Sequence, residues 1–117
     1  MHRRELEVRG ASVGELPGML HEELRAERKG SVDRYDGDGF DLIVVERYYL
    51  RNNSDQQATI LLDRTAEETS RVAIFSGGGG TGLLQISLGS HSSQTERLAD
   101  RIVSICGSEE FDLEVVE

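Results

Sequence analysis

The sequence predicts an α+β domain in which two helices pack on one face of an antiparallel sheet of about five to seven strands. Apolar residues recur at helical spacing in two segments, residues 13–28 and 93–107. Between them, apolar and polar residues alternate along short segments separated by turns, which is typical of consecutive antiparallel strands. Each element has one apolar face to bury, and a two-layer arrangement buries all of them.

The chain is predicted to start with a strand and a helix. Residues 3–9 alternate polar and apolar side chains, which favours a short strand at an edge of the sheet. Ser12 stands three residues before Glu15, which is the spacing of a helix capping box, and apolar residues follow at helical spacing. The only proline, Pro17, suits a helix that begins one residue before it. Gly30 follows two basic residues and predicts the end of the helix.

A series of strands without an intervening helix is predicted next. The strands cover residues 31–35, 40–51, 57–63, 71–76 and 83–88, and the turns between them cover residues 36–39, 52–55, 65–68 and 77–82. The Asp-Gly-Asp-Gly turn over residues 36–39 is typical of a β-hairpin. Consecutive strands joined by such short turns favour an antiparallel meander.

A second helix and an edge strand are predicted to follow. Ser93 and Glu96 again have capping-box spacing, an apolar stripe follows them, and Gly107 ends the pattern. Residues 111–115 then alternate apolar and acidic side chains, as in a last edge strand or a tail that pairs with another segment. With both helices on one sheet face, the opposite face is expected to be solvated, to cover a pocket or to meet another subunit.

The composition fits one small acidic domain over residues 1–117. The chain has 13 basic and 22 acidic residues and a formal net charge of −9, so nucleic acid and acidic membrane surfaces are not expected as partners. No apolar run is long enough for a membrane span, and the N-terminal residues alternate instead of forming the apolar part of a signal peptide. The protein is therefore expected to be cytoplasmic, which suits its single cysteine, Cys106.

The glycine run is the strongest functional clue in the sequence. Five glycines occupy six positions, namely Gly77, Gly78, Gly79, Gly80, Thr81 and Gly82. The run matches a Gly-x-Gly-x-x-Gly pattern, but a dinucleotide site needs a helix directly after it, and residues 83–88 are predicted to be a strand. Leu83 and Leu84 stand where a P-loop requires lysine and then serine or threonine. Two alternatives remain: a flexible hairpin tip, or a loop that closes over a small ligand and offers its N–H groups to an anion.

Glu46, Arg47 and Tyr48 form the second candidate site. If the strand over residues 40–51 is unbroken, Glu46 shares a face with the apolar residues of that strand. A carboxylate in an apolar row needs a partner, because an unpaired buried charge is costly. Either a bulge or a strand end takes Glu46 into solvent, or Glu46 is a polar anchor in a pocket with Tyr48 beside it.

The remaining residues do not combine into a catalytic or metal-binding set. His2, His21 and His91 show no ligand spacing, and with one cysteine a structural zinc site is not expected. A Ser-His-acid triad through His91 lacks a nucleophile-elbow sequence, and His91 is expected to be a turn residue. Cys106 falls on the apolar side of the second helix and is expected to pack as a small hydrophobe. The sequence therefore predicts no catalytic residue, no metal and no cofactor.

The order of the elements and two short motifs resemble a family of small bacterial proteins of unknown function. The motifs are a strand ending in Glu-Arg-Tyr and a glycine run after a later strand, and the resemblance spans roughly residues 3–106. The strand after the glycines departs from the family, because residues 83–88 contain neither an aromatic residue nor a lysine. The resemblance implies a fold and no catalytic residue. The arrangement is also similar to helix-grip ligand-binding folds, in which a long C-terminal helix lies across a curved sheet.

The sequence thus favours a non-enzymatic binding or protein-interaction module, with a homodimer formed through the uncovered sheet face or an edge strand. The alternative is a small-ligand-binding domain of the helix-grip kind, in which the ligand contacts the glycine run and the segment from Glu46 to Tyr48. An enzyme of unknown type is third. Two observations distinguish these functions: the direction in which Glu46 points, and whether the glycine loop covers a cavity.

Overall fold

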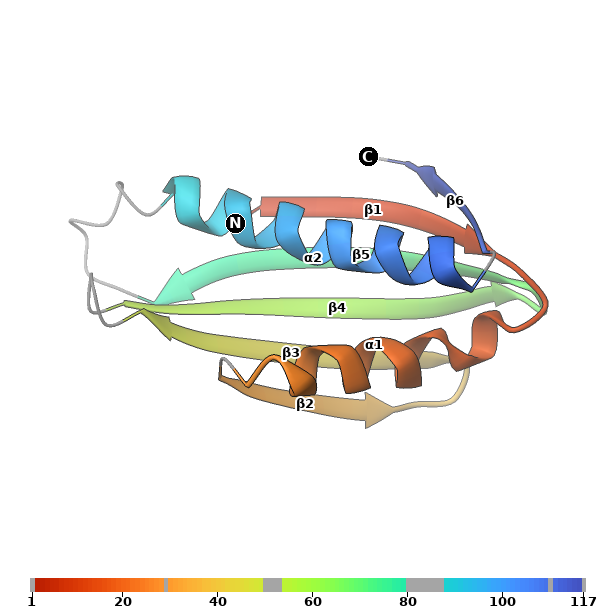
Figure 1. Cartoon of the computed structure of the whole chain (residues 1–117), viewed down its shortest axis with the longest axis horizontal. Coiled ribbons are helices and arrows are strands. Elements are labelled where there is room, and N and C mark those ends of the chain that lie inside the picture. The colour runs from red at the N-terminus through yellow and green to blue at the C-terminus, as the bar shows by residue number, and fades with distance from the viewer. Residues whose placement is uncertain (1, 29, 50–53, 80–87, 110, 117) are drawn as a thin grey trace.

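The fold is seen in a computed structural model (Figure 1), which describes residues 2–28, 30–49, 54–79, 88–109 and 111–116. Side chains are described for these residues apart from 47–49, 54–56, 78–79 and 88–94. The elements are β1 (His2–Arg9), the 3-10 turn η1 (Val13–Glu15), α1 (Leu16–Ala26), β2 (Ser31–Asp36), β3 (Phe40–Tyr49), β4 (Ser54–Ala66), β5 (Thr69–Gly79), α2 (Leu88–Ser108) and β6 (Asp112–Val115). They form an α+β fold, as predicted.

Among the described residues, six antiparallel strands form one sheet in the order β2-β3-β4-β5-β1-β6. Strands β2 to β5 follow one another along the chain and form a meander. β1 pairs with the other side of β5, so that Leu6 lies opposite Val72, and β6 pairs with the remaining side of β1. The prediction of an edge strand over residues 3–9 was wrong for residues 6–9, because β6 pairs with them, whereas residues 3 and 4 have no described strand on that side.

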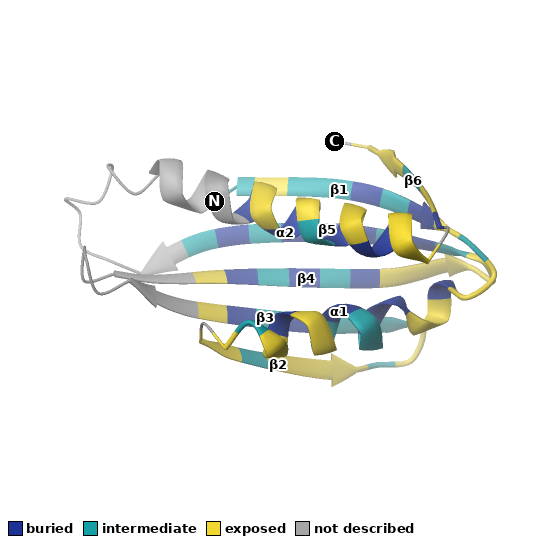
Figure 2. Cartoon of the chain, viewed as in Figure 1, coloured by how far each residue is buried: buried dark blue, intermediate teal, exposed yellow. Residues whose placement is uncertain are grey.

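Both helices lie on one face of the sheet, which we call the inner face (Figure 1). α1 packs against β2 and β3, and α2 packs against β5 and β1. Figure 2 shows that buried residues gather where the helices meet the sheet. Most of this core is aliphatic and comes from both helices and from the inner positions of the strands: Leu6, Val8, Leu16, Leu20, Leu24, Ile43, Val45, Ala58, Ile60, Leu62, Val72, Ile74, Leu98, Ile102 and Ile105. Phe111 and Cys106 also belong to it.

The first helix begins at Leu16, as predicted, but without the capping box. In η1, which precedes it, the Glu15 N–H donates a hydrogen bond of 2.9 Å to the Ser12 carbonyl. The Ser12 side chain makes no capping hydrogen bond, because this backbone turn already uses the N–H group that the serine hydroxyl would bind. The helix ends at Ala26, ahead of the predicted stop at Gly30, whose φ is 144°.

The second helix is longer than the sequence predicts. It begins at Leu88 instead of near Ser93, includes His91, and continues through Gly107 to Ser108. The strand predicted over residues 83–88 therefore ends in a helical residue, and its first five residues lie outside the described part of the chain. The helix was predicted from its apolar stripe, and the serine-rich segment before that stripe has none.

The fourth strand is also longer than predicted. Ser54 and Asp55, predicted to lie in a turn, are the first residues of β4, and the strand runs to Ala66 past a bulge after Arg64. The meander thus contains four described strands between the two helices, where the sequence predicts five. The predicted hairpin between β2 and β3 is confirmed. Its Gly39 has a φ of 83°, a left-handed conformation that glycine adopts without strain.

Polar contacts connect the helices to each other and to the sheet. The Arg101 guanidinium on α2 lies 3.3 Å from the Glu23 carboxylate on α1 and also pairs with Glu27, just beyond the end of α1. The buried hydroxyls of Ser76 and Thr95 form a hydrogen bond between β5 and α2. The inner face is therefore covered by the chain's own helices, and the available sheet surface is on the opposite side.

Candidate functional site

The strand register brings the two candidate segments of the sequence to the same end of the sheet. Three successive rows cross β3, β4 and β5 there, and each row contains one residue of the Glu-Arg-Tyr segment and one glycine of the run. The rows are Glu46–Gln57–Gly77, Arg47–Gln56–Gly78 and Tyr48–Asp55–Gly79. Segments about thirty residues apart in the chain thus lie two strands apart, at about 10 Å.

This register corrects the prediction that residues 77–82 form a loop. Residues 77–79 belong to β5 and pair with β4, whereas Gly80, Thr81 and Gly82 lie outside the described residues. Glycine weakens a strand because it has no side chain to pack, and this propensity is why a loop was predicted. Backbone pairing with β4 outweighs the propensity at the first three glycines.

The described part of the structure excludes a dinucleotide site for a different reason from the one given by the sequence. The sequence argument relied on a strand after the glycines, but α2 begins at Leu88. In a dinucleotide-binding fold, the glycine motif connects a strand to a helix within a parallel βαβ unit, and the helix starts inside the motif. All described strand pairs are antiparallel, and α2 starts well beyond Gly82. The described residues therefore contain no such unit.

Glu46 is exposed on the sheet face opposite the helices, which we call the outer face. Leu42 of the same strand also lies on the outer face, whereas Ile43 is buried against the helices. Of the alternatives left open by the sequence, a strand position open to solvent fits this placement. Arg47 and Tyr48 have their backbone in β3, and their side chains are outside the described set.

The outer face carries two rows of side chains that run from β2 through β3, β4 and β5 to β1, and five of their six central residues are apolar. We call them the apolar rows. No described helix lies over either row (Figure 1). Five of their six central side chains are partly exposed, and the sixth, Ala73, is buried. We name them the leucine row, which is Tyr35, Leu42, Leu61, Ala73 and Glu5, and the phenylalanine row, which is Asp33, Val44, Thr59, Phe75 and Arg3.

The two ends of these rows differ in charge. At the β1 end, the Arg3 guanidinium pairs with the Glu5 carboxylate at 2.9 Å and lies 5.6 Å from the centre of the Phe75 ring, within cation–π range. At the β2 end, Tyr35 is 63% exposed. Asp33, beside it, is exposed and has no ion-pair partner within the described part of the chain. The apolar centre of the outer face is thus bordered by the Arg3–Glu5 ion pair on the β1 side and by the Asp33 carboxylate on the β2 side.

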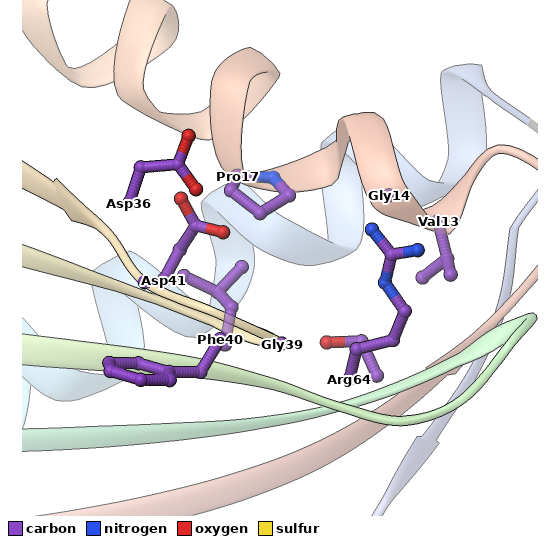
Figure 3. Close-up of a pocket in the computed structure, with 11 residues that line it drawn as sticks. Val13, Gly14, Pro17, Asp36, Gly39, Phe40, Asp41 and Arg64 are labelled. Atoms are coloured by element: carbon purple, nitrogen blue, oxygen red, sulfur yellow. The ribbon is translucent and has the colours of Figure 1, made fainter.

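A small polar cavity lies on the inner side, where the β2–β3 hairpin meets the start of α1 (Figure 3). Asp36 and Asp41 line one end, and the Arg64 guanidinium reaches toward Gly14 at the other. The Arg34 side chain donates a hydrogen bond of 2.8 Å to the Asp41 carboxylate. The volume is about 80 Å³, room for about two or three water molecules, whereas small-molecule sites start at about 300 Å³. This cavity is therefore too small to be a ligand-binding site.

Cys106 is buried on the inner side of α2, as predicted. Burial removes the thiolate from water and raises the pKa of the thiol from 9.0 to about 11. Reactive cysteines have a lowered pKa and are accessible, so this thiol is a packed apolar group and not a nucleophile.

We expect Cys106 to resist alkylation at pH 8 until the chain unfolds. The raised pKa lowers the thiolate fraction about 100-fold relative to the unfolded chain. Because the folded state keeps the thiol proton to a higher pH than the unfolded state, the free energy of unfolding depends on pH through Cys106. The contribution of the protonated thiol to stability is fully present below about pH 9 and is lost as the pH rises through about 11. Iodoacetamide labelling with and without denaturant measures the first effect, and the pH dependence of unfolding in wild type and Cys106→Ala measures the second. Equal labelling rates for folded and unfolded chain would contradict this expectation.

Within the described residues, no three His, Cys, Asp or Glu side chains are grouped to hold a metal ion. No described helix combines the length and the apolar character needed to cross a membrane. No family model, curated protein or solved structure matches the chain. The resemblance to a family of small bacterial proteins thus rests on the sequence motifs alone, and function has to be inferred from the outer face and the glycine end of the sheet.

Proposed function

We propose that this chain is a non-enzymatic protein-interaction module that binds its partner through the outer face of the sheet. The observation that carries the proposal is the pair of apolar rows, which cross adjacent strands with no described helix over them (Figure 1). Apolar sheet faces are normally covered by a second layer, because their exposure to water is unfavourable. The chain's helices cover the inner face, so a partner would supply the missing layer on the outer face.

The chemistry of the outer face favours a protein partner over a small molecule. Its centre is apolar and includes the Phe75 ring, and its border carries Arg3 and Glu5, a pattern typical of protein interfaces with an apolar centre and a polar rim. A strand surface of this kind offers no enclosed volume of the sort that small ligands occupy. The free thiol of Cys106 suits a reducing compartment, so we place the module in the cytoplasm.

A photo-crosslinking amino acid in the outer face tests the proposal. With benzoylphenylalanine in place of Leu61, we expect covalent adducts with a partner protein in cells that express the chain, identified by mass spectrometry. The same probe in place of Val103, which is 47% exposed on α2, is the matched control and should give no adduct with that partner. Equal adducts from the two positions, or none from the Leu61 position, would refute the proposal.

A small-ligand-binding function is the second candidate, and the rows shared by the Glu-Arg-Tyr segment and the glycines favour it. At Gly77 the absence of a side chain leaves space on the strand surface, two strands from the exposed Glu46 carboxylate. A small polar molecule with a hydrogen-bond donor for this carboxylate would fit such a place.

Glu46→Gln separates binding from stability in this second candidate. We expect ligand affinity to fall about tenfold or more, since a charge-assisted hydrogen bond is lost. Stability should change by less than about 0.5 kcal/mol, because Glu46 is exposed. Thermal-shift screening of nucleotides, phosphates and small carboxylates identifies a ligand, and calorimetry then compares the two proteins. A wild-type chain stabilised by none of these compounds would remove support for this function, and equal losses of affinity and stability would make Glu46 a structural residue.

A further inference from the structure

We propose that the partner of the outer face is a second copy of this chain. The two sheets stack face to face about a two-fold axis that lies between them and runs parallel to β4, directly over it. This inference rests on the proposed interaction function and names the partner. Rotation by 180° about such an axis keeps each row at the same height along the strands and reverses its order across the sheet. Each row of one copy then lies on the same row of the second copy, with its β2 end over the β1 end.

In the phenylalanine row, this rotation places opposite charges together. Asp33 of one copy lies over Arg3 of the second copy, and the reverse contact forms at the other end of the row. Between them, Val44 lies over Phe75, and Thr59 meets its own equivalent on the axis. Asp33 has no ion-pair partner within the described part of a single chain, so the second copy would supply one.

The leucine row is self-complementary in size. Leu42 of one copy lies over Ala73 of the second copy, whose small side chain leaves room for it, and Leu61 meets Leu61 on the axis. Tyr35, which is 63% exposed in the single chain, lies over Glu5, a hydrogen-bond acceptor for its hydroxyl. This contact would shelter the most exposed aromatic ring among the described side chains of the outer face.

The glycine end of the sheet fits the same stacking. In the next row, Glu46 of one copy faces Gly77 of the second copy, and Gln57 lies on the axis. Stacked sheets are only about 10 Å apart, so a side chain at Gly77 would compete for space with the Glu46 side chain. The two candidate segments of the sequence therefore meet across the interface. The limited space between the stacked sheets gives a steric reason for a glycine at position 77.

The outer face is large enough for a weak dimer. Five strands spaced about 4.8 Å apart, crossed by the three rows described above at about 6.7 Å spacing, cover roughly 480 Å² in each copy. Two copies together bury roughly 1,000 Å², which is the size of weak, transient interfaces. We therefore expect a dissociation constant on the order of 10 μM.

Other arrangements of two copies predict different contacts. An axis across the strands would place Asp33 over Tyr35 and Arg3 over Glu5 of the second copy. Pairing through the free edges of β2 or β6 would leave both apolar rows exposed. Of these arrangements, the axis along β4 alone makes Asp33 and Arg3 partners.

Charge exchange tests the proposed arrangement in solution. The wild-type chain should sediment as a mixture of monomer and dimer between about 1 and 300 μM. Asp33→Arg and Arg3→Glu each bring like charges together twice in the dimer, and each should weaken self-association about 100-fold. An equimolar mixture of the two variants restores opposite charges at both places, and its heterodimer should form with an affinity within about threefold of wild type.

These outcomes, together with those of photo-crosslinking, distinguish self-association from binding to a different protein. A wild-type chain that stays monomeric over this range would overturn the inference, and so would a mixture that associates no better than the single variants. If the probe at the Leu61 position forms adducts only with a different protein, the inference of a second copy is wrong and the proposed interaction function stands. If the probe forms no adduct at all, the proposed interaction function is wrong. Thermal unfolding at low concentration checks that Asp33→Arg and Arg3→Glu are folded, as expected at exposed positions.

A cysteine on the axis gives a measurement that needs no charge reversal. Thr59→Cys would bring two thiols together, within reach of a short bismaleimide, whereas Ser31→Cys would place them near opposite edges of the stacked sheets. Cys106 is buried and should not react. A high yield of cross-linked dimer from Thr59→Cys with little from Ser31→Cys supports the axis along β4, and equal yields would overturn it.

Discussion

Replacing Ile102 with alanine should lower the free energy of unfolding by about 3 kcal/mol, because its fully buried side chain packs in the core between α2 and the sheet. The substitution loses buried apolar surface and leaves a cavity that the surrounding side chains fill only in part. The next residue, Val103, is 47% exposed, so Val103→Ala should change stability by less than about 0.5 kcal/mol. Urea titrations followed by circular dichroism at one protein concentration measure both variants.

Ile102 and Val103 are adjacent residues of the same helix, so the two substitutions form a matched pair. Alanine is the better helix former at both positions, so helix propensity does not account for a loss at Ile102. An unchanged dependence on urea concentration would show that the folded state of the variant is as compact as that of the wild type. If the variants at Ile102 and Val103 were equally stable, α2 would not pack on the sheet as described.

A second matched pair, Leu61 and Leu62, distinguishes the two faces of β4. Leu62 is 2% exposed in the core, and Leu62→Asp should unfold the chain, since a buried unpaired carboxylate costs about 4 kcal/mol or more. Leu61 lies on the outer face, and Leu61→Asp should leave the chain folded at a cost of less than about 1.5 kcal/mol. Circular dichroism during heating measures both effects, at a concentration low enough for the wild type to be a monomer.

At high concentration, Leu61→Asp should sediment as a monomer, because two carboxylates would meet on the proposed axis. The substitution adds the same charge as Leu62→Asp, so a difference between the two variants reports the face and not the charge. If Leu61→Asp were as unstable as Leu62→Asp, Leu61 would belong to a core, and the outer face would not be a binding surface.

The layers of this fold follow from the hydrophobic period of each segment, but the strand partners do not. Leu20 and Leu24 recur at helical spacing and are buried, so α1 could be predicted with its start at Leu16. β1 has the alternation of an edge strand, and β6, more than a hundred residues further along the chain, pairs with its second half. Local periodicity records which face of a strand is apolar and carries no information on which distant strand will pair with it.

The candidate site could be predicted in its residues but not in its placement. Leu42 and Ile43 alternate along β3, and both faces of this strand are apolar, so the sequence could not tell which face the helices cover or where Glu46 points. The row that joins Glu46 to Gly77 depends on the register of two successive hairpins. The outer face escaped prediction as a defined surface for the same reason, since its rows combine residues from five strands.

The place of β1 between β5 and β6 has a consequence for how the chain folds. β1 is synthesised before the other described strands, yet Leu6 pairs with Val72 and with Val115, which are synthesised far later. The hairpins from β2 to β5 close short loops and form quickly, whereas β1 joins the sheet only through contacts that are distant in sequence. Until then its backbone N–H and C=O groups are unpaired, and such an edge invites pairing with other chains. β6 covers residues 6–9 of this edge, so the pairing of two segments at opposite ends of the chain also shortens the edge that is open to other chains.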